Sequence, residues 1–238
     1  VPLLVAQIIS EHGSQEQKGE LLPKLVNGSI FHVGLGINNS LLSTDPYQSD
    51  VTAEENGKEI ILNGSKTGIA FANQANTFLI SASNESGECN LYFVNKDQEG
   101  VTLEDKDFMG LKGAPLSQIN LSNCKINASQ KLGGHNYSIN YEALVDSSRI
   151  GMSALALGVC QAVLDYVVPY TNERVAFDEP ISNRQSVAFM VADMAIETEA
   201  LRLMIYKSAA LKDLGEDFHK QASLTYRFAA HHGMKIGT

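Results

Sequence analysis

The spacing of apolar side chains changes twice along this chain, and that change constrains the fold more than any single motif does. Residues 1 to 29 have a helical period, residues 30 to 137 contain short strand-like segments, and residues 138 to 238 are helical again. Few folds place helices, an antiparallel sheet and long antiparallel helices in this order. We therefore predict an α+β protein with three parts: the end of an N-terminal helical domain, a central antiparallel β-sandwich or barrel, and a C-terminal antiparallel helix bundle.

The first region has the signals of two short helices. The apolar residues that recur there at helical spacing are Val1, Leu4, Val5, Ile8 and Ile9. The segment His12–Ser14 then interrupts the pattern. Ser14 and Gln17 have the Ser-x-x-Gln form of a capping box, which predicts a second helix that ends near Asn27–Gly28.

The middle region is typical of a series of strands separated by turns. Its β-branched and aromatic segments are 59–62, 77–80, 91–94, 101–103 and 118–121. The dipeptides Asn56-Gly57 and Asn63-Gly64 have the composition of hairpin turns. We expect about seven antiparallel strands.

The last region predicts three helices. Residues 150–168 are apolar on nearly every face, which favours a buried helix, and Pro169 should kink it or end its regular hydrogen bonding. Ser182 and Gln185 predict the capped start of a second helix. That helix should end at Lys212–Gly215, where a basic last turn precedes a glycine, and a third helix should start near Asp217.

Composition excludes several classes of function. A net charge of −9 argues against a nucleic-acid partner, and no run approaches the roughly 20 apolar residues of a membrane span. Three widely spaced cysteines suit reduced thiols in a cytoplasmic protein. The pair His231-His232 does not indicate a metal site, because neighbouring residues of a helix face different ways. The chain lacks an initiator methionine, so we expect that an N-terminal piece precedes Val1.

Six short motifs occur in one order and resemble those of the acyl-CoA dehydrogenase family. They are Gly13–Lys18 with Leu22–Leu25, Leu62–Lys66, Met109–Gly113, Asp146–Arg149, Arg174–Phe177 with Gln185, and Ala192–Met194. The resemblance covers essentially the whole chain. It implies the fold described above and an enzyme that binds FAD.

The resemblance implies that the second half of the chain holds part of the cofactor. Arg174 and Phe177 would reach the FAD of a neighbouring subunit, Ile181 would pack near it, and Gln185 would add a polar contact. A guanidinium is a charged, planar donor that suits pyrophosphate oxygens. Without the resemblance, Arg174 would be interpreted as an exposed cation at a helix end and Phe177 as a core aromatic.

The first half of the flavin pocket departs from the family pattern. The family's Thr-Glu-Pro-x-x-Gly-Ser-Asp loop falls on residues 38–45, where Asn38 can still form hydrogen bonds and Thr44 stands in place of a serine. Ser43 replaces a glycine, so the backbone should approach the cofactor less closely. Gly68 and Ala70 stand where the family has a tryptophan and a hydroxyl residue beside the flavin ring.

The resemblance does not supply a catalytic base. In some members a glutamate stands where this chain has Ser148, and a serine cannot act unaided as the base that removes an α-proton. In most members the glutamate lies in a later segment, so we expect the base beyond Thr238 and name no catalytic residue. Asp146 and Arg149 are interpreted as a carboxylate near a helix N-terminus and its local partner.

The function implied by the resemblance is FAD-dependent α,β-dehydrogenation of an acyl-CoA thioester, as in fatty acid metabolism. Electrons would pass to an electron-transfer flavoprotein, and the protein would be a homodimer or homotetramer in the cytoplasm, or in the mitochondrial matrix of a eukaryote. Two alternatives stay open. One is a scaffold of the same fold that has lost catalysis, and the other is a related flavin enzyme that uses oxygen. The sequence does not predict the acyl chain length.

Overall fold

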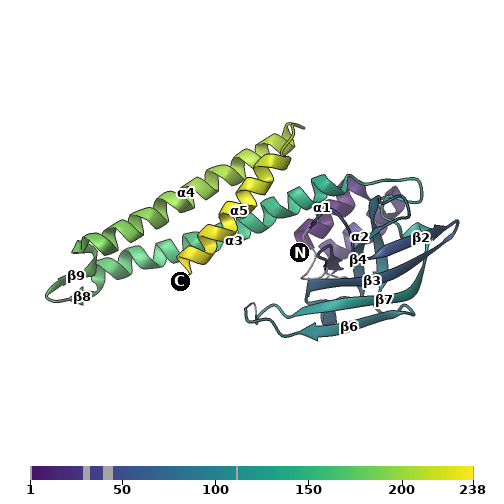
Figure 1. Ribbon diagram of the computed structural model, residues 1–238, viewed down its shortest axis with the longest axis horizontal. Helices are drawn as coiled ribbons and strands as arrows, with labels where there is room; N and C mark the ends of the chain where they lie inside the picture. Colours follow the sequence, from purple (N-terminus) through teal and green to yellow (C-terminus); the bar gives the residue numbers. More distant parts are fainter. Residues whose placement is uncertain (1, 29–32, 40–44, 111, 238) are drawn as a thin grey trace. The chain divides into compact units, whose positions relative to one another are not determined.

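A computed structural model describes residues 2–28, 33–39, 45–110 and 112–237 (Figure 1). The chain divides into two compact units, residues 1–141 and 142–238, and each is described by itself. The predicted fold class is confirmed, because N-terminal helices precede a curled central sheet and further helices follow it.

The two N-terminal helices form as the sequence predicts. Helix α1 spans Pro2–His12 and helix α2 spans Gln15–Val26. The predicted capping box is present, since Gln17 N donates to Ser14 Oγ and Ser14 N donates to the Gln17 side chain. Two of the amide groups that a helix start leaves unpaired are thereby satisfied.

A seven-stranded sheet forms the body of the first unit. The strands are β1 (Val33–Gly36), β2 (Thr52–Asn56), β3 (Glu59–Ala70), β4 (Thr77–Ser83), β5 (Cys89–Asn95), β6 (Val101–Lys106) and β7 (Leu116–Asn127). Their path order is β1-β4-β2-β3-β7-β6, with β5 paired to β4. Four pairings are antiparallel, whereas β1 and β2 each pair with β4 in parallel. The prediction of a purely antiparallel sheet is therefore wrong for these two pairings.

Of the two Asn-Gly dipeptides predicted to form hairpin turns, one is a turn and the other is not. Asn56-Gly57 joins β2 to β3, as predicted. Asn63-Gly64 instead lies inside β3, at a shift of register against β7. Gly64 has φ +128° there, and a Cβ at this position would collide with the carbonyl oxygen of Asp50. The glycine permits a β-bulge in which the backbone of Asp50 lies close to β3. The prediction of a hairpin turn at this dipeptide is therefore wrong.

The core of this unit lies on the buried side of the sheet. Its fully buried large side chains include Ile60, Leu62, Ile69, Phe78 and Ile80. Apolar residues alternate with exposed ones along β7, as expected for a sheet with one buried face. This core supports the β1 and β3 ends described below.

Helices form the second unit. Helix α3 spans Tyr141–Glu173, α4 spans Gln185–Asp213 and α5 spans His219–Ile236. A short hairpin of β8 (Val175–Ala176) and β9 (Glu179–Pro180), followed by the 3₁₀ turn η3 (Ile181–Asn183), joins α3 to α4 (Figure 1). Leu157, Leu201, Ile205 and Ala229 form the core that the three helices share.

One predicted feature of these helices is wrong and one is confirmed. Pro169 lies inside helix α3, which continues to Glu173. Helix α4 begins at Gln185, and Ser182 lies in η3 and does not cap it. The predicted stop of α4 is present, because Gly215 N and Glu216 N donate to the carbonyls of Lys212 and Leu211, as in a Schellman motif.

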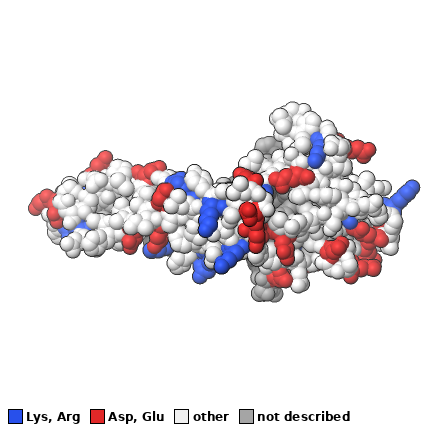
Figure 2. Space-filling view, turned by 90° about the horizontal axis from the view of Figure 1, so that it is seen from above, with Lys and Arg blue, Asp and Glu red and all other residues white. Residues whose placement is uncertain are grey.

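Many apolar side chains of this unit are exposed in the single chain. On α3 they include Met152, Leu155, Val159 and Tyr166, and on α4 they include Phe189, Met190, Leu203 and Tyr206. Large areas of the helical part carry neither acidic nor basic side chains on the face shown in Figure 2. The prediction that α3 is buried on all sides therefore fails for one copy of the chain.

Helix α3 also corrects the expectation about membrane spans. It is long enough to cross a bilayer, and its most apolar 18-residue window has a mean hydropathy of 1.6 with only 17% of the window buried. By length and composition the helix meets the criterion for a span. The expectation that no segment is long and apolar enough for a membrane span is therefore wrong for α3.

Candidate functional site

In the first unit, Asn38, which follows β1, lies beside the end of β3. We call the surface made by Asn38, Gly68 and Ala70 the wall of the site. Thr67 N donates to the carbonyl oxygen of Asn38 across 3.2 Å. Gly68 has φ +69°, and a Cβ there would meet only the amide nitrogen of Asn38, at 3.4 Å. The Asn38 side chain is exposed, so its amide group can donate a hydrogen bond beside the backbone of Gly68.

Ala70 and Thr44 complete the residues predicted for this half of the site. Ala70 is the last residue of β3 and is paired with Leu116 of β7, half-buried. Its methyl group offers no hydrogen bond. Thr44 lies outside the described residues, so the structure places only Asn38 and Ala70 of the three.

Lys66 and Asn39 organise the segment that follows β1, and the sequence analysis did not single them out as site residues. Lys66 is fully buried, and its Nζ donates to Asn39 Oδ1 across 2.5 Å. Burial lowers the pKa of Lys66 to about 8, although Cys89 and Asp50 act in the opposite direction. The signal available in the sequence was a lysine on the same side of the strand as Ile60 and Leu62.

The thiol of Cys89 remains protonated near this lysine. Burial raises the pKa of Cys89 to about 11, although the charge of Lys66 and hydrogen bonds from neighbouring hydroxyls lower it. Burial is also the largest cause that raises the pKa of Tyr141, whose hydroxyl lies 3.2 Å from Ser81 Oγ. These groups are neutral hydrogen-bonding partners at neutral pH, not nucleophiles.

In the second unit, the β8–β9 hairpin brings together three of the predicted cofactor residues. Ile181 N donates to the carbonyl oxygen of Arg174 across 2.9 Å, which places the two residues on opposite sides of the hairpin. The guanidinium of Arg174 lies 5.7 Å from the ring centroid of Tyr170. Phe177 stands at the tip and is 88% exposed. Phe177 is therefore not a core aromatic of this chain.

The turn of this hairpin is strained. Phe177 and Asp178 have φ +57° and φ +64°, so both are left-handed, as a type I′ turn requires. Glycine, asparagine and aspartate tolerate this region, whereas a bulky residue such as phenylalanine is an outlier. Each left-handed residue other than glycine costs about 1–2 kcal/mol. Strain of this kind persists only where surrounding contacts hold it.

Arg184 supplies such contacts, and sequence analysis missed it. Its Nη2 donates to the carbonyl oxygen of Ala176 across 3.2 Å and lies 3.9 Å from Glu179 Oε1. Its guanidinium carbon lies 5.0 Å from the ring centroid of Phe177. A basic residue directly before a long helix was the only available signal, and the contacts depend on a hairpin that the sequence did not predict.

Gln185 is the first residue of α4 and its side chain is exposed. No side chain caps this helix start. The hairpin and the first turn of α4 thus gather the guanidinium of Arg174, an exposed aromatic ring and an amide side chain. Such a donor set suits an anionic ligand that also carries an aromatic ring system.

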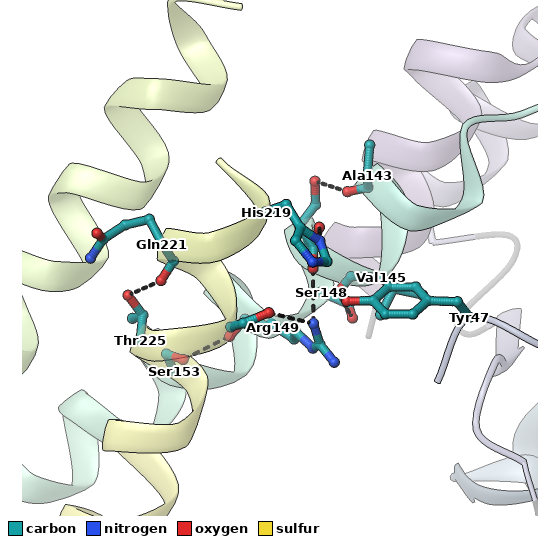
Figure 3. A network of polar contacts seen from close by, with 12 residues as sticks. Tyr47, Ala143, Val145, Ser148, Arg149, Ser153, His219, Gln221 and Thr225 are labelled. Atoms are coloured by element: carbon teal, nitrogen blue, oxygen red, sulfur yellow. Dashed lines mark hydrogen bonds and ion pairs between the residues drawn. The ribbon is translucent and has the colours of Figure 1, made fainter. Parts of the chain in front are cut away.

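A polar network joins α3 to α5 (Figure 3). The carboxylate of Asp146 is buried, with one oxygen 3.0 Å from Arg149 Nη1 and the other 2.8 Å from His219 Nδ1. The same Arg149 nitrogen donates to Ser223 Oγ across 2.9 Å. The predicted local pairing of Asp146 with Arg149 is confirmed. Asp146 lies in the second turn of α3, however, because the helix begins at Tyr141.

Ser148 takes part in ordinary helix bonding. Its hydroxyl donates to the carbonyl oxygen of Val145 across 2.6 Å, within α3. Such a bond within the helix gives the hydroxyl no activating base. The adjacent pair His231-His232 is equally unlike a reactive site, since His232 is buried against Thr198 and Glu197 while His231 is exposed.

The residues present fit a dinucleotide flavin on the evidence of their own chemistry. The second unit offers the guanidinium of Arg174 for a pyrophosphate and an exposed ring for an aromatic surface. The first unit offers the exposed amide of Asn38 beside Gly68, which has no side chain. The wall lacks the hydroxyl and the indole that the resemblance would place at Ala70 and Gly68.

Comparison with known families and proteins shows what the chain is similar to. Residues 41–124 match the family described as "Acyl-CoA dehydrogenase, middle domain", and residues 140–238 match "Acyl-CoA dehydrogenase, C-terminal domain". The short/branched chain specific acyl-CoA dehydrogenase of Rattus norvegicus mitochondria is 31% identical over 234 residues, which are 95% of this chain and 54% of that protein. The 3-(aryl)acrylate reductase of Clostridium sporogenes is 32% identical over 94% of this chain and 61% of its own length.

A solved structure shows the same similarity. The glutaryl-CoA dehydrogenase of Mycobacterium smegmatis, in complex with FADH2, superposes with a TM-score of 0.85 at 25% identity and covers 98% of this chain. This chain corresponds to 60% of that structure. It spans between about half and three fifths of the relatives that it matches, and FAD is the cofactor that these relatives indicate.

Proposed function

Because this chain belongs to the acyl-CoA dehydrogenase family, we propose that the protein containing it is an FAD-dependent oxidoreductase that acts on acyl-CoA thioesters. The observation that carries the proposal is the match of two consecutive domains of this family to residues 41–124 and 140–238. The hairpin that exposes Arg174 and Phe177 supports it independently, since its donor set suits a flavin dinucleotide. We assign residues 1–29, 30–137 and 138–238 to the end of the first domain, the middle domain and the C-terminal domain.

We assign the cofactor contacts to two groups of residues. Arg174 would bind pyrophosphate oxygens of the FAD of a neighbouring subunit, and Phe177, Ile181 and Gln185 would lie against the same cofactor. Asn38, Thr44 and Ala70 would line the FAD bound by their own subunit. When bound, FAD accepts the hydride that leaves the β-carbon of the acyl group. The protein residues hold the cofactor and keep water away from it.

The reaction also needs a base that removes the α-proton of the thioester. We infer that Ser148 does not serve, because its hydroxyl donates to the helix carbonyl of Val145. Asp146 is equally unsuited, because its oxygens are bound by Arg149 and His219. We therefore assign the base to neither residue.

We propose that the protein is a homodimer or homotetramer. Exposed apolar side chains on α3 and α4 support this, since contiguous apolar surfaces of this extent mark interaction sites. We attribute the apolar face of α3 to packing between copies and not to a bilayer. The same helix carries Gln161 and Asp165, which bond to each other, and Arg202 of α4 reaches Gln161 across 2.6 Å. Hydrogen bonds of this kind between neighbouring helices are typical of a helix bundle.

An electron-transfer flavoprotein is the electron acceptor that we propose. We place the protein in the cytoplasm, or in the mitochondrial matrix if the source is eukaryotic. The three buried free cysteines suit such reducing compartments.

The direction of the reaction has a second candidate. A relative of similar identity is named a 3-(aryl)acrylate reductase. The same arrangement of flavin and base would then reduce a conjugated carbon–carbon double bond. An enzyme of this type would take hydride from the reduced flavin and return a proton to the α-carbon.

The decisive experiment begins with the full-length protein. It should purify with flavin absorption, and anaerobic mixing with a panel of acyl-CoA thioesters should bleach that absorption. Bleaching by a saturated acyl-CoA supports dehydrogenation, whereas reoxidation of the reduced protein by an enoyl-CoA or an acrylate supports the reductase. A protein that neither carries nor binds FAD would contradict both and leave the non-catalytic scaffold.

A further inference from the structure

The β8–β9 hairpin is too short to hold its own conformation. It has only two residue pairs, Val175 with Pro180 and Ala176 with Glu179. An isolated two-stranded hairpin is marginal even when longer. Its turn also carries two left-handed residues in succession, neither of them glycine. Contacts from outside the hairpin must therefore stabilise it.

Arg184 contacts each part of the hairpin. Its guanidinium group binds the carbonyl oxygen of Ala176 in β8, lies near the carboxylate of Glu179 in β9, and lies over the ring of Phe177 in the turn. A planar fork of donors with two faces can make these three contacts together, whereas the ammonium of a lysine cannot. The backbone of the same residue leads into α4, because Ala188 N donates to its carbonyl oxygen.

We propose that Arg184 is a positioning residue for the flavin site: it holds the strained turn so that the exposed Phe177 ring is fixed before FAD binds. The inference rests on the proposed function, which makes Phe177 a contact of FAD. A preformed contact avoids the loss of conformational freedom that a mobile loop would suffer on binding. Arg184 thus raises the affinity for FAD through Phe177 without contacting FAD itself.

A rescue experiment separates the contribution of Arg184 to FAD affinity from the contribution of the turn conformation. In Asp178→Gly, the second turn position accepts the left-handed conformation without a side-chain penalty. The full-length protein is compared as wild type, Arg184→Met, Arg184→Lys and the double variant Arg184→Met with Asp178→Gly. Each is labelled with 4-fluorophenylalanine at position 177, so that fluorine NMR of the FAD-free protein reports the environment of the ring. Flavin fluorescence titration gives the dissociation constant for FAD.

Arg184→Met should move the fluorine resonance to the position of an unstructured peptide and weaken FAD binding about tenfold. Arg184→Lys should behave nearly as Arg184→Met, because a lysine lacks the planar fork. The double variant should recover most of the FAD affinity, because a glycine lets the turn form with less help. Arg202→Met removes an arginine from the same helix, far along the chain from the hairpin, and should change neither measurement.

Three outcomes would overturn the inference. The first is an unchanged fluorine resonance in Arg184→Met. The second is a shifted resonance with unchanged FAD affinity, which would mean that the ring position does not serve the cofactor. The third is a double variant as weak as Arg184→Met, which would mean that Arg184 binds FAD directly. A wild-type protein that binds no FAD would instead contradict the proposed function, and the fluorine resonance would still decide whether Arg184 positions Phe177.

Discussion

The ammonium nitrogen of Lys66 lies 2.5 Å from Oδ1 of Asn39, so a fully buried lysine in β3 holds the segment that follows β1. The same Asn39 oxygen accepts from Asp50 N, and its amide nitrogen donates to the carbonyl oxygen of Gln48. Asn39, at the start of the segment that the resemblance assigns to the flavin loop, therefore bonds both to β3 and to the residues that precede β2.

The free energy of unfolding should rise with pH because of Lys66. Its pKa is lowered to about 8 in the folded protein, whereas an unfolded lysine titrates near pH ~10.4. Between these values the unfolded chain binds more protons, so stability increases as pH rises and the cost of the buried charge disappears. The total gain is about 3 kcal/mol at most.

Chemical denaturation followed by circular dichroism at several pH values from about 7.5 to about 10.4 tests this expectation. The difference in unfolding free energy between wild type and Lys66→Met isolates the lysine from the tyrosines and cysteines that titrate in the same range. Lys58→Met, which removes an exposed lysine from the β2–β3 turn, is the matched control. A pH-independent difference between wild type and Lys66→Met would show that Lys66 is not the group responsible.

Arg174→Ala should weaken FAD binding by tenfold or more. Under the proposed assignment, the variant would lose a charge-assisted hydrogen bond to a phosphate oxygen, worth about 1.5–3 kcal/mol. Fluorescence titration of the full-length protein with FAD measures the change, and circular dichroism confirms that the variant is folded. Equal affinity in wild type and Arg174→Ala would make Arg174 a surface cation that only stacks on Tyr170.

Ser148→Ala should leave the turnover number within about twofold, whereas loss of a catalytic base typically costs 100- to 10,000-fold. The hydroxyl bonds only to the Val145 carbonyl among the contacts described for it. Single-turnover reduction of the flavin by the preferred acyl-CoA is the appropriate measurement, because it isolates the proton and hydride transfers. A hundredfold slower reduction in Ser148→Ala would place this serine in the chemistry.

Asp146→Ala should loosen α5 more than His219→Ala does. Asp146 is buried between Arg149 and His219, and its removal leaves Arg149 without its carboxylate, at a cost of about 3 kcal/mol. His219 is half exposed, so its loss should cost about 1 kcal/mol or less. Hydrogen exchange of the α5 amides should accelerate about a hundredfold in the first variant and less than tenfold in the second. Equal protection in both variants and the wild type would show that the network does not fasten α5.

The sequence predicted those parts of the fold that depend on local chemistry. The capping box at Ser14 and the stop at Gly215 require only neighbouring residues, and both are present. Strand β1 escaped notice because Val-Gly-Leu-Gly has two glycines and little strand propensity. Strand β2 escaped because Thr-Ala-Glu-Glu-Asn is short and acidic. Their pairing with neighbouring strands, which no local pattern contains, makes them strands.

The residues of the candidate site could also be predicted only in part. Arg174, Phe177 and Ile181 were predicted through a motif, and the hairpin brings them together. The contact of Lys66 with Asn39 joins residues that are 27 positions apart in the sequence. The contacts of Arg184 are closer in the sequence but depend on the turn between β8 and β9, so no spacing rule could reveal either set. Asn63-Gly64 shows that a local pattern can also predict the wrong structure. A dipeptide that favours turns also suits a bulge, and only the pairing of β3 with β7 distinguishes the two.

The left-handed backbone at Gly68 has an evolutionary consequence. A tryptophan introduced here would adopt φ +69°, a region that large L-residues avoid, so one codon change could not place an indole there in a relaxed geometry. Substitution at this position is therefore constrained by the backbone conformation as well as by the space beside it. The chemistry beside this strand can change more easily through neighbouring side chains than through Gly68 itself.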